Sequence, residues 1–201
     1  MKKHVIAATL IALSAGAALA QQAPAKEGPW MVRARAVHLD SANGDSTGLG
    51  LSVNNKTIPE VDISYFFNKN VAAELILTVP QKHHVYSTAL GGDIGTLRHL
   101  PPTLTLQYHF DLGSVKPYVG AGINYTHFSS IHLAGGAATV DKTSWGGALQ
   151  VGMDIPVGKN MYLNLDVKKV YIDTDVSVGG AKVGNFKVNP LLVGVGLGWR
   201  F

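Results

Sequence analysis

The chain has 201 residues, the length of one domain, with 23 glycines, 46% hydrophobic residues and only 15% charged residues. It contains no cysteine, which excludes disulfides and thiol chemistry. The formal charge of +4 includes two lysines of an N-terminal leader, so the rest is nearer neutral and lacks the basic stripe that nucleic-acid binding needs. We predict no nucleic-acid partner and no cofactor.

The first twenty residues have the pattern of a cleaved secretory signal peptide. Lys2 and Lys3 precede an apolar stretch that ends in small residues up to Ala20, and the segment is too short and wrongly flanked for a membrane helix. Residues 21–29 form a polar leader, which we expect on the periplasmic side. Nothing later in the chain approaches the roughly 20 apolar residues that a membrane helix needs. The sequence therefore predicts export to the outer membrane of a Gram-negative bacterium.

From Trp30 onward, eight segments alternate apolar and polar residues, each near the roughly 9 to 11 residues of a tilted transmembrane strand. We predict strands at 30–39, 57–68, 71–79, 103–110, 117–128, 144–155, 161–172 and 189–201. Short and long connections alternate, and one long loop covers 80–100. This pattern predicts an all-β fold, an eight-stranded antiparallel up-and-down transmembrane β-barrel over 30–201, with both termini on the periplasmic side.

The last strand shows the pattern most plainly. Its odd-numbered positions from Leu191 to Phe201 are apolar, and the opposite face carries three glycines and Arg200. The outward faces lack the polar residues of a solvated surface, which disfavours a soluble lipocalin-like barrel. We also expect a periplasmic aromatic girdle, formed by Trp30, Phe67, Phe110, Tyr118, Tyr162, Trp199 and Phe201.

Several stretches resemble the outer-membrane protein W (OmpW) family. They are 58–67 (IPEVDISYFF), 100–108 (LPPTLTLQY), 116–125 (KPYVGAGINY) and the terminal Gly-Trp-Arg-Phe201, and 30–35 (WMVRAR) looks like the first strand of the family. The resemblance covers the whole mature chain. It implies a narrow, largely apolar lumen and passage of small hydrophobic molecules across the outer membrane. The terminal Phe201 also resembles the signal that barrel-assembly machinery recognises, and lipid and lipopolysaccharide are expected around the barrel.

The inward positions of the periplasmic half are polar. They include Arg33, Arg35, Glu74, His109, Asp154, Asn164, Asp166 and Arg200. Opposite charges in so confined a space should pair, since an unpaired buried charge is strongly destabilising. Inward glycines leave room for the long arginines. We predict a polar plug at the periplasmic exit that mainly holds the barrel shut, and none of these residues is expected to be catalytic.

Two prolines, Pro59 and Pro80, fall near the outer ends of neighbouring strands. Proline cannot donate to a strand ladder, so pairing should fail there. One hypothesis is a lateral gap through which an apolar ligand leaves into the bilayer. The alternative is that the prolines simply end strands where loops begin. For the ligand path we predict an apolar upper lumen with Phe66, Ile76 and Leu192, joined by Leu97 and Leu100 from the loop.

Six histidines lie in or near the extracellular half: His38, His83, His84, His99, His127 and His132. Their irregular spacing does not predict a metal site, and we expect solvated loop histidines. No local spacing picks out a nucleophile and a base, so we predict no enzyme. An ion-conducting porin would need about twice as many strands. The remaining alternative to a conduit is a structural or adhesive barrel without transport activity.

Overall fold

The computed structural model describes residues 27–201. The predicted signal peptide, 1–20, and most of the leader, 21–29, lie outside the described residues. Within 27–201 the structure contains no helix long and apolar enough to cross a membrane.

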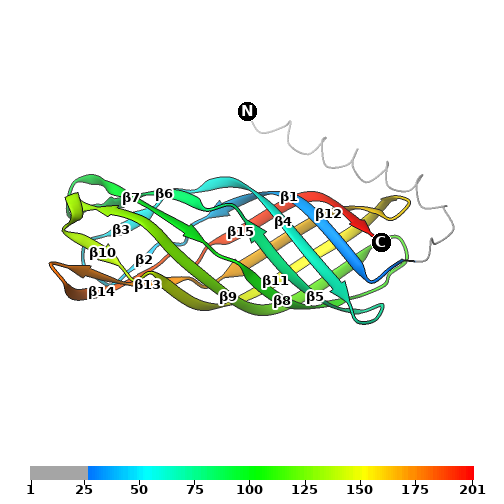
Figure 1. The fold of residues 1–201 in the computed structure, drawn as a ribbon. Helices are drawn as coiled ribbons and strands as arrows, with labels where there is room; N and C mark the ends of the chain where they lie inside the picture. The colour runs from blue at the N-terminus through cyan, green and yellow to red at the C-terminus, as the bar shows by residue number, and fades with distance from the viewer. Residues whose placement is uncertain (1–26) are drawn as a thin grey trace, which may run out of the picture.

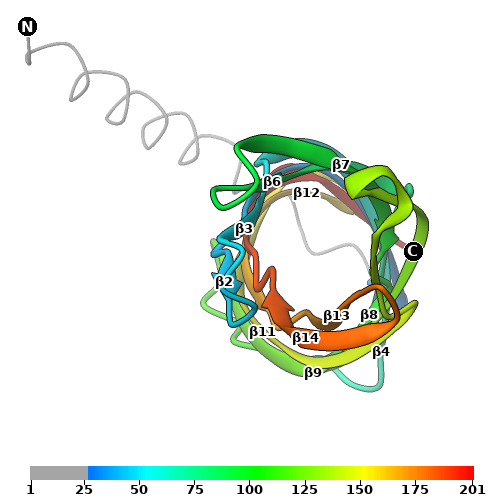
Figure 2. The same cartoon turned by 90° about the vertical axis from the view of Figure 1, so that its left-hand side faces the viewer.

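Eight strands form a closed antiparallel ring (Figures 1 and 2). Around the ring they are β1 (Trp30–Asp40), β4 (Lys56–Phe66), β5 (Val71–Thr78), β8 (Thr103–His109), β9 (Lys116–Leu133), β11 (Thr143–Gly158), β12 (Met161–Val170) and β15 (Leu191–Arg200). The ring closes where β15 pairs with β1, from Met31 opposite Arg200 to Asp40 opposite Leu191. The predicted eight-stranded up-and-down barrel is confirmed.

The end of the barrel away from the C-terminus carries further strands (Figure 1). They are β2 (Gly44–Asp45), β3 (Leu51–Val53), β6 (Gln81–Ser87), β7 (Gly92–Leu100), β10 (Ala138–Val140), β13 (Asp173–Val178) and β14 (Ala181–Lys187), with one short 3-10 turn, η1 (Ala134–Gly136). The prediction of a loop over 80–100 is wrong, because β6 and β7 form a hairpin there. In β6, buried His83 and Val85 alternate with exposed Lys82 and His84. That strand was missed because its exposed face carries charge instead of apolar residues.

The outer face of the eight-strand ring is apolar. Large exposed side chains there include Val61, Ile63, Leu75, Leu77, Leu104, Leu106, Val119, Ile123, Leu149, Val151, Leu165, Val167, Val193, Val195 and Leu197. Near the C-terminal end of the barrel, Tyr65 lies edge-on to Trp30 and Phe67, and Tyr108 contacts Phe110. These aromatics form one girdle of a lipid-facing band.

Two aromatics expected in that girdle point inward instead. Tyr118 is 0% exposed and Tyr162 is 4% exposed. The reason is strand parity, since exposed Val119 directly follows Tyr118 and successive side chains face opposite sides. The prediction of an outward position for these two residues is wrong.

The interior divides into two layers along the barrel axis. The layer nearer the termini is polar and holds the buried charges. The layer nearer β6 and β7 is an apolar core, formed by Val37, Leu39, Leu51, Val53, Ile58, Val85, Leu97, Phe128, Leu133, Val140, Ala148, Val170, Ile172, Val176, Phe186, Val188 and Leu192.

Candidate functional site

Arg33 is the centre of the polar layer. Its Nε and Nη2 donate to the two carboxylate oxygens of Asp154 at 3.1 and 2.7 Å. Its Nη1 reaches Asp62 at 3.1 Å, Ser64 at 2.8 Å and Glu74 at 3.3 Å. The whole residue is 0% exposed, so its guanidinium is held entirely by these partners.

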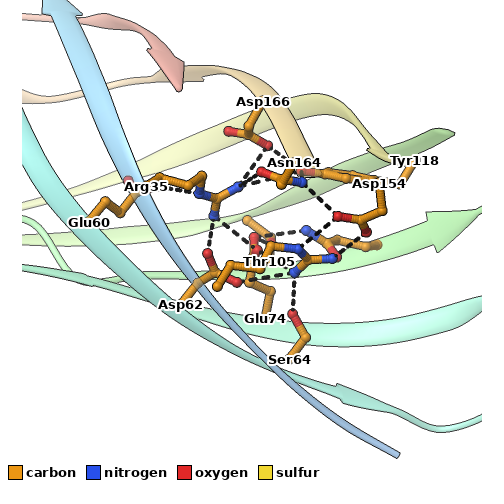
Figure 3. A network of polar contacts seen from close by, with 12 residues as sticks. Arg35, Glu60, Asp62, Ser64, Glu74, Thr105, Tyr118, Asp154, Asn164 and Asp166 are labelled. Atoms are coloured by element: carbon orange, nitrogen blue, oxygen red, sulfur yellow. Dashed lines mark hydrogen bonds and ion pairs between the residues drawn. The ribbon is translucent and has the colours of Figure 1, made fainter. Parts of the chain in front are cut away.

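Arg35, one inward step further along β1, holds a second set of carboxylates (Figure 3). It pairs with Asp62, with Glu74 at 3.2 Å and with Glu60 at 2.9 Å. Because Asp62 and Glu74 also contact Arg33, the two arginines share their counter-ions. Lys168 continues the network, with its Nζ 2.7 Å from Glu60 and 2.9 Å from Asp166.

Neutral polar groups complete the network across the lumen. The amides of Gln107 and Gln150 donate to Glu74 Oε2 at 2.8 and 2.9 Å. The hydroxyl of Tyr118 donates to Asp166 at 2.7 Å. Strands from all sides of the ring are thereby tied together through side chains. The layer is a continuous, buried ionic network in which each cation contacts two or more carboxylates.

The predicted plug residues do not all lie in one cluster. Arg33, Arg35, Glu74, Asp154 and Asp166 lie in the network, and His109 joins it through a bond to Gln107 at 2.9 Å, but Arg200 lies outside it. Network members that the prediction missed are Glu60, Asp62, Ser64, Gln107, Tyr118, Gln150 and Lys168. Most of them could have been predicted from the sequence, because they alternate with exposed apolar residues along their strands.

Arg200 belongs to a separate layer at the rim near the termini. Its Nη1 lies 2.7 Å from Glu27, and its Nε donates to the carbonyl of Gly28 at 2.9 Å. Its guanidinium stacks over the ring of Phe66 at 3.7 Å. Phe66 was expected in the apolar upper lumen and lies instead at this opposite end. The reason is chain direction, because β4 runs toward the rim and Phe66 is its last residue.

Inward glycines of β15 give the arginines their space. A Cβ added at Gly198 would lie 3.0 Å from Arg33 Cγ, and one at Gly194 would lie 3.5 Å from Arg35 Cδ. At Gly196 it would meet the carbonyl of Ala34 and lie 2.7 Å from Arg35 Cα. The backbones of β1 and β15 therefore approach each other where only glycine fits.

A hollow lies directly above the ionic network. It is small and partly open to solvent. Its apolar lining includes Leu39, Ile58, Ile76, Val170, Ile172 and Leu192, and Glu60 and Lys168 of the network also line it. Two predicted path residues, Ile76 and Leu192, thus face this hollow. Leu97 belongs to the apolar core above, and half-buried Leu100 pairs with His127 on β9.

The hollow also reaches the barrel wall. Leu77, which is 40% exposed on the outer face, lines it together with Thr78 and Pro101. At this height the ladder between neighbouring strands is interrupted. Pairing of β4 with β5 stops at Glu60 opposite Thr78, and pairing resumes only between β3 and β6, at Val53 opposite Val85.

Both predicted gap prolines lie in this interruption, between 54–59 on one side and 79–84 on the other. Four side-chain bonds cross it in place of a ladder. Lys56 Nζ donates to the carbonyl of Lys82 at 2.9 Å, and Thr78 Oγ1 donates to that of Pro59 at 2.8 Å. The backbone amide of His84 donates to Asn54 Oδ1 at 2.9 Å, and Nδ1 of His83 lies 3.0 Å from the carbonyl oxygen of Asn54.

Both strands also change parity across the break. Ile58 and Ile76 are the inward residues on its lower side, and Val53 and Gln81 are those on its upper side. An interval of five residues is incompatible with regular alternation. Each strand is therefore irregular where the ladder is missing, which explains why no regular pairing spans the segment.

Two histidines expected in solvent are buried near the break. His83 is 0% and His99 2% exposed, and their rings stack at 4.8 Å between centroids. The expectation of solvated side chains is wrong for this pair. Both face inward on the β6–β7 hairpin, in the segment that was predicted to be a loop. Among residues 27–201 no group of three or more potential ligands could hold a metal ion.

Comparison with known proteins agrees with this architecture. The model of the OmpW family matches residues 26–201. The chain belongs to the OmpW family. The barrel is therefore a protein of the Gram-negative outer membrane. Because such barrels have short periplasmic turns and longer extracellular loops, we assign the end with β6 and β7 to the extracellular side and the end with Trp30 and Phe201 to the periplasmic side.

Three relatives illustrate the similarity in sequence. Outer-membrane protein y4mB of Sinorhizobium fredii is 42% identical, over 89% of this chain and 85% of that protein. Outer membrane protein W of Escherichia coli K12 is 35% identical over 100% of both chains. The dibenzothiophene metabolism operon protein PahQ of Pseudomonas aeruginosa is 29% identical over 91% of this chain and 93% of that one.

Two solved structures illustrate the similarity in fold. The crystal structure of OprG from Pseudomonas aeruginosa superposes with a TM-score of 0.76 at 26% identity, covering 89% of this chain and 98% of that one. AlkL in lipid bilayers, solved by solid-state NMR, gives a TM-score of 0.68 at 25% identity, covering 90% and 93%. Both are outer-membrane barrels like this chain.

Proposed function

We propose that this barrel passes small hydrophobic molecules from the outside into the hollow and releases them sideways into the bilayer. The observation that carries the proposal is the position of the hollow. It ends downward on the ionic network and outward at the interrupted ladder. A solute that enters it has a sealed floor below and an unpaired segment of wall beside it.

The floor argues against an aqueous path straight through the barrel. Arg33, Arg35, Glu74 and Asp62 are all buried and share one another as partners. Opening a path between them would leave buried charges uncompensated, which costs about 3–5 kcal/mol for each broken pair. An eight-stranded barrel is also just wide enough to be filled by its side chains.

Opening the barrel wall at the ladder break costs less free energy than opening the ionic network. Between 54–59 and 79–84 there is no backbone ladder to break. The contacts that do cross are four side-chain bonds, each worth about 1 kcal/mol. Because Leu77 touches both the hollow and the outer face, an apolar molecule stays in apolar contact on the way out. A small apolar ligand is in keeping with the name of one relative, a dibenzothiophene metabolism operon protein.

The partners follow from this role. We propose lipid and lipopolysaccharide around the outer face, a small hydrophobic ligand in the hollow, and barrel-assembly machinery that recognises the last strand. Phe201, which is 63% exposed at the periplasmic edge, supports the last of these. The proposal includes no chemical step on the ligand.

The test is a reversible lock across the break. Pro59 and Val79 follow directly after the last ladder pair, Glu60–Thr78, and both are exposed on the outer face. We expect the double variant P59C/V79C to take up labelled p-xylene when reduced and several-fold more slowly when its disulfide is formed. Since the chain has no cysteine of its own, no other disulfide competes.

The matched control is I63C/L75C, a pair already joined within the ladder and away from the hollow. Its uptake should be the same in both redox states. Entry of a sugar of similar size should not depend on the protein at all. If cells with and without the protein take up p-xylene equally, the structural or adhesive role is favoured. If the sugar enters faster with the protein, the floor is open and the proposal is wrong.

A further inference from the structure

The polar groups around the hollow show what kind of ligand it suits. The polar side chains that line it are Glu60, Thr78, His99, Thr103, Asn124 and Lys168. Five of these six already have partners. Glu60 and Lys168 bind each other at 2.7 Å, and Thr78 donates to the Pro59 carbonyl. Asn124 donates to Thr103 at 2.8 Å and accepts from Thr126.

His99 differs from the other five. Its Nε2 is buried and has no hydrogen-bond partner within the described part of the chain. The neighbours of the His99 ring are aromatic: the ring of His83 stacks on it at 4.8 Å between centroids, and the ring of Phe128 lies edge-on at 6.3 Å. His83 has a bond from its Nδ1 to the carbonyl of Asn54 at 3.0 Å and does not line the hollow. His99 therefore lines a mostly apolar space and carries a buried nitrogen that has no hydrogen-bond partner within residues 27–201.

A buried polar atom without a partner is costly, and a ligand that satisfies it recovers that cost. Burial lowers the pKa of His99 to about 3, and the neighbouring His83 and Lys56 lower it as well, so the ring is neutral at pH 7. A neutral imidazole has one donor and one acceptor nitrogen. A hydroxyl group both donates and accepts, so it can pair with Nε2 in either tautomer.

We infer that the hollow prefers apolar molecules that carry a single uncharged hydroxyl group over the corresponding hydrocarbons, with His99 as the polar contact. This inference rests on the proposed function and refines its substrate class. A carboxylate does not fit, because Lys168 is already shared between Glu60 and Asp166. A buried anion would have no free cation to pair with and would pay its full desolvation cost.

The experiment compares p-cresol with p-xylene, which differ by a hydroxyl in place of a methyl group. The full chain, labelled with ¹⁵N-histidine and held in lipid bilayers, is titrated with each compound by NMR. Dissociation constants are expressed as concentrations in the lipid phase, which removes the difference in partitioning. We expect p-cresol to bind about tenfold more tightly, the effect of one buried hydrogen bond. Only p-cresol should move the Nε2 resonance of His99.

Three variants locate the effect. His99→Phe keeps an aromatic ring without nitrogens and should bind both compounds equally. His99→Gln restores a donor and an acceptor and should recover part of the preference. The control, His127→Phe, changes an exposed histidine of β9 and should keep the tenfold preference.

The outcomes separate this inference from the proposed function. If the wild-type protein binds p-xylene and p-cresol equally, or if His99→Phe keeps the preference, the inference is wrong while the conduit stands. If the wild-type protein binds neither compound, both are wrong. If His99→Phe does not fold, the Nε2 resonance of the wild-type protein decides, since a p-cresol complex that leaves it unmoved contradicts the inference.

Discussion

Arg33 and Asp154 lie 121 positions apart in the chain, yet two nitrogens of the guanidinium donate to both carboxylate oxygens at 3.1 and 2.7 Å. The contact joins β1 to β11 across the lumen. Bidentate pairs of this kind are stronger than single hydrogen bonds and fix orientation. Arg33 thereby ties opposite walls of the barrel together at the floor of the hollow.

Replacing Arg33 by Met should destabilise the barrel strongly. The change removes the cation and leaves Asp154, Asp62 and Glu74 with less compensation, which costs about 3–5 kcal/mol. Urea unfolding in lipid vesicles, followed by the shift of folded barrel on unheated gels, measures the effect. Arg98→Met, at an exposed position of β7, should change stability by less than about 0.5 kcal/mol. Equal stability of the two variants would contradict the role of the network.

Replacing both Pro59 and Pro80 by Thr should slow the uptake of apolar compounds several-fold. Each change restores a backbone N–H, and Thr favours strands, so the ladder can extend into the break. Uptake of labelled p-xylene by cells measures the effect. Pro29→Thr, below the barrel rim, serves as the control. Unchanged uptake in the double variant would favour the simpler interpretation that these prolines only end strands.

Glycine 196 should not tolerate even a methyl group. Because a Cβ there would lie 2.7 Å from Arg35 Cα and meet the carbonyl of Ala34, Gly196→Ala forces β15 away from β1 at the seam of the barrel. We expect a lower yield of folded barrel and a loss of several kcal/mol in stability. Gly147→Ala is the matched change, since its nearest neighbour would be 3.8 Å away. Two variants that fold equally well would show that the seam adapts.

The β6–β7 hairpin should lose stability in acid. Burial lowers the pKa of His83 to about 4 from 6.5, against its hydrogen bond to Asn54, and Lys56 lowers it too. Between about pH 6.5 and 4 the opened hairpin therefore binds a proton that the closed one does not. Stability falls as the pH drops through this window, by at most about 1.4 kcal/mol per pH unit for this residue.

Hydrogen exchange of the hairpin amides at several pH values, corrected for the intrinsic rate, measures this slope. His83→Phe should reduce it, whereas His132→Phe, at an exposed position of β9, should not. A slope that is the same in all three proteins would show that His83 does not titrate on opening.

The sequence by itself determined the ring of eight strands and the side of the sheet on which most residues lie. Val61 and Ile63 on one face require Asp62 and Ser64 on the other, because strand geometry has a strict period of two. Because the outer face lies in lipid, residues along each strand alternate between apolar and polar, and the sequence shows this alternation directly. The same rule would have placed Tyr118 and Tyr162 inward had it been applied to them.

The extracellular strands escaped prediction for a physical reason. In the extracellular extension of the barrel, both faces of β6 and β7 are polar enough that Lys82, His83, His84 and Arg98 give no apolar alternation. Such strands form because their neighbours continue upward and offer hydrogen-bonding edges, which is a property of the assembled barrel.

Only the tertiary structure decided the site. The bidentate pairing of Arg33 with Asp154, the stacking of His83 on His99 and the common height of the ladder break and the hollow all join segments that are distant in sequence. Strand alternation gives the face of each residue, whereas the stagger between strands gives its height. Position along the barrel axis places Phe66 at the periplasmic rim and places Ile76 and Leu192 together above the ionic network.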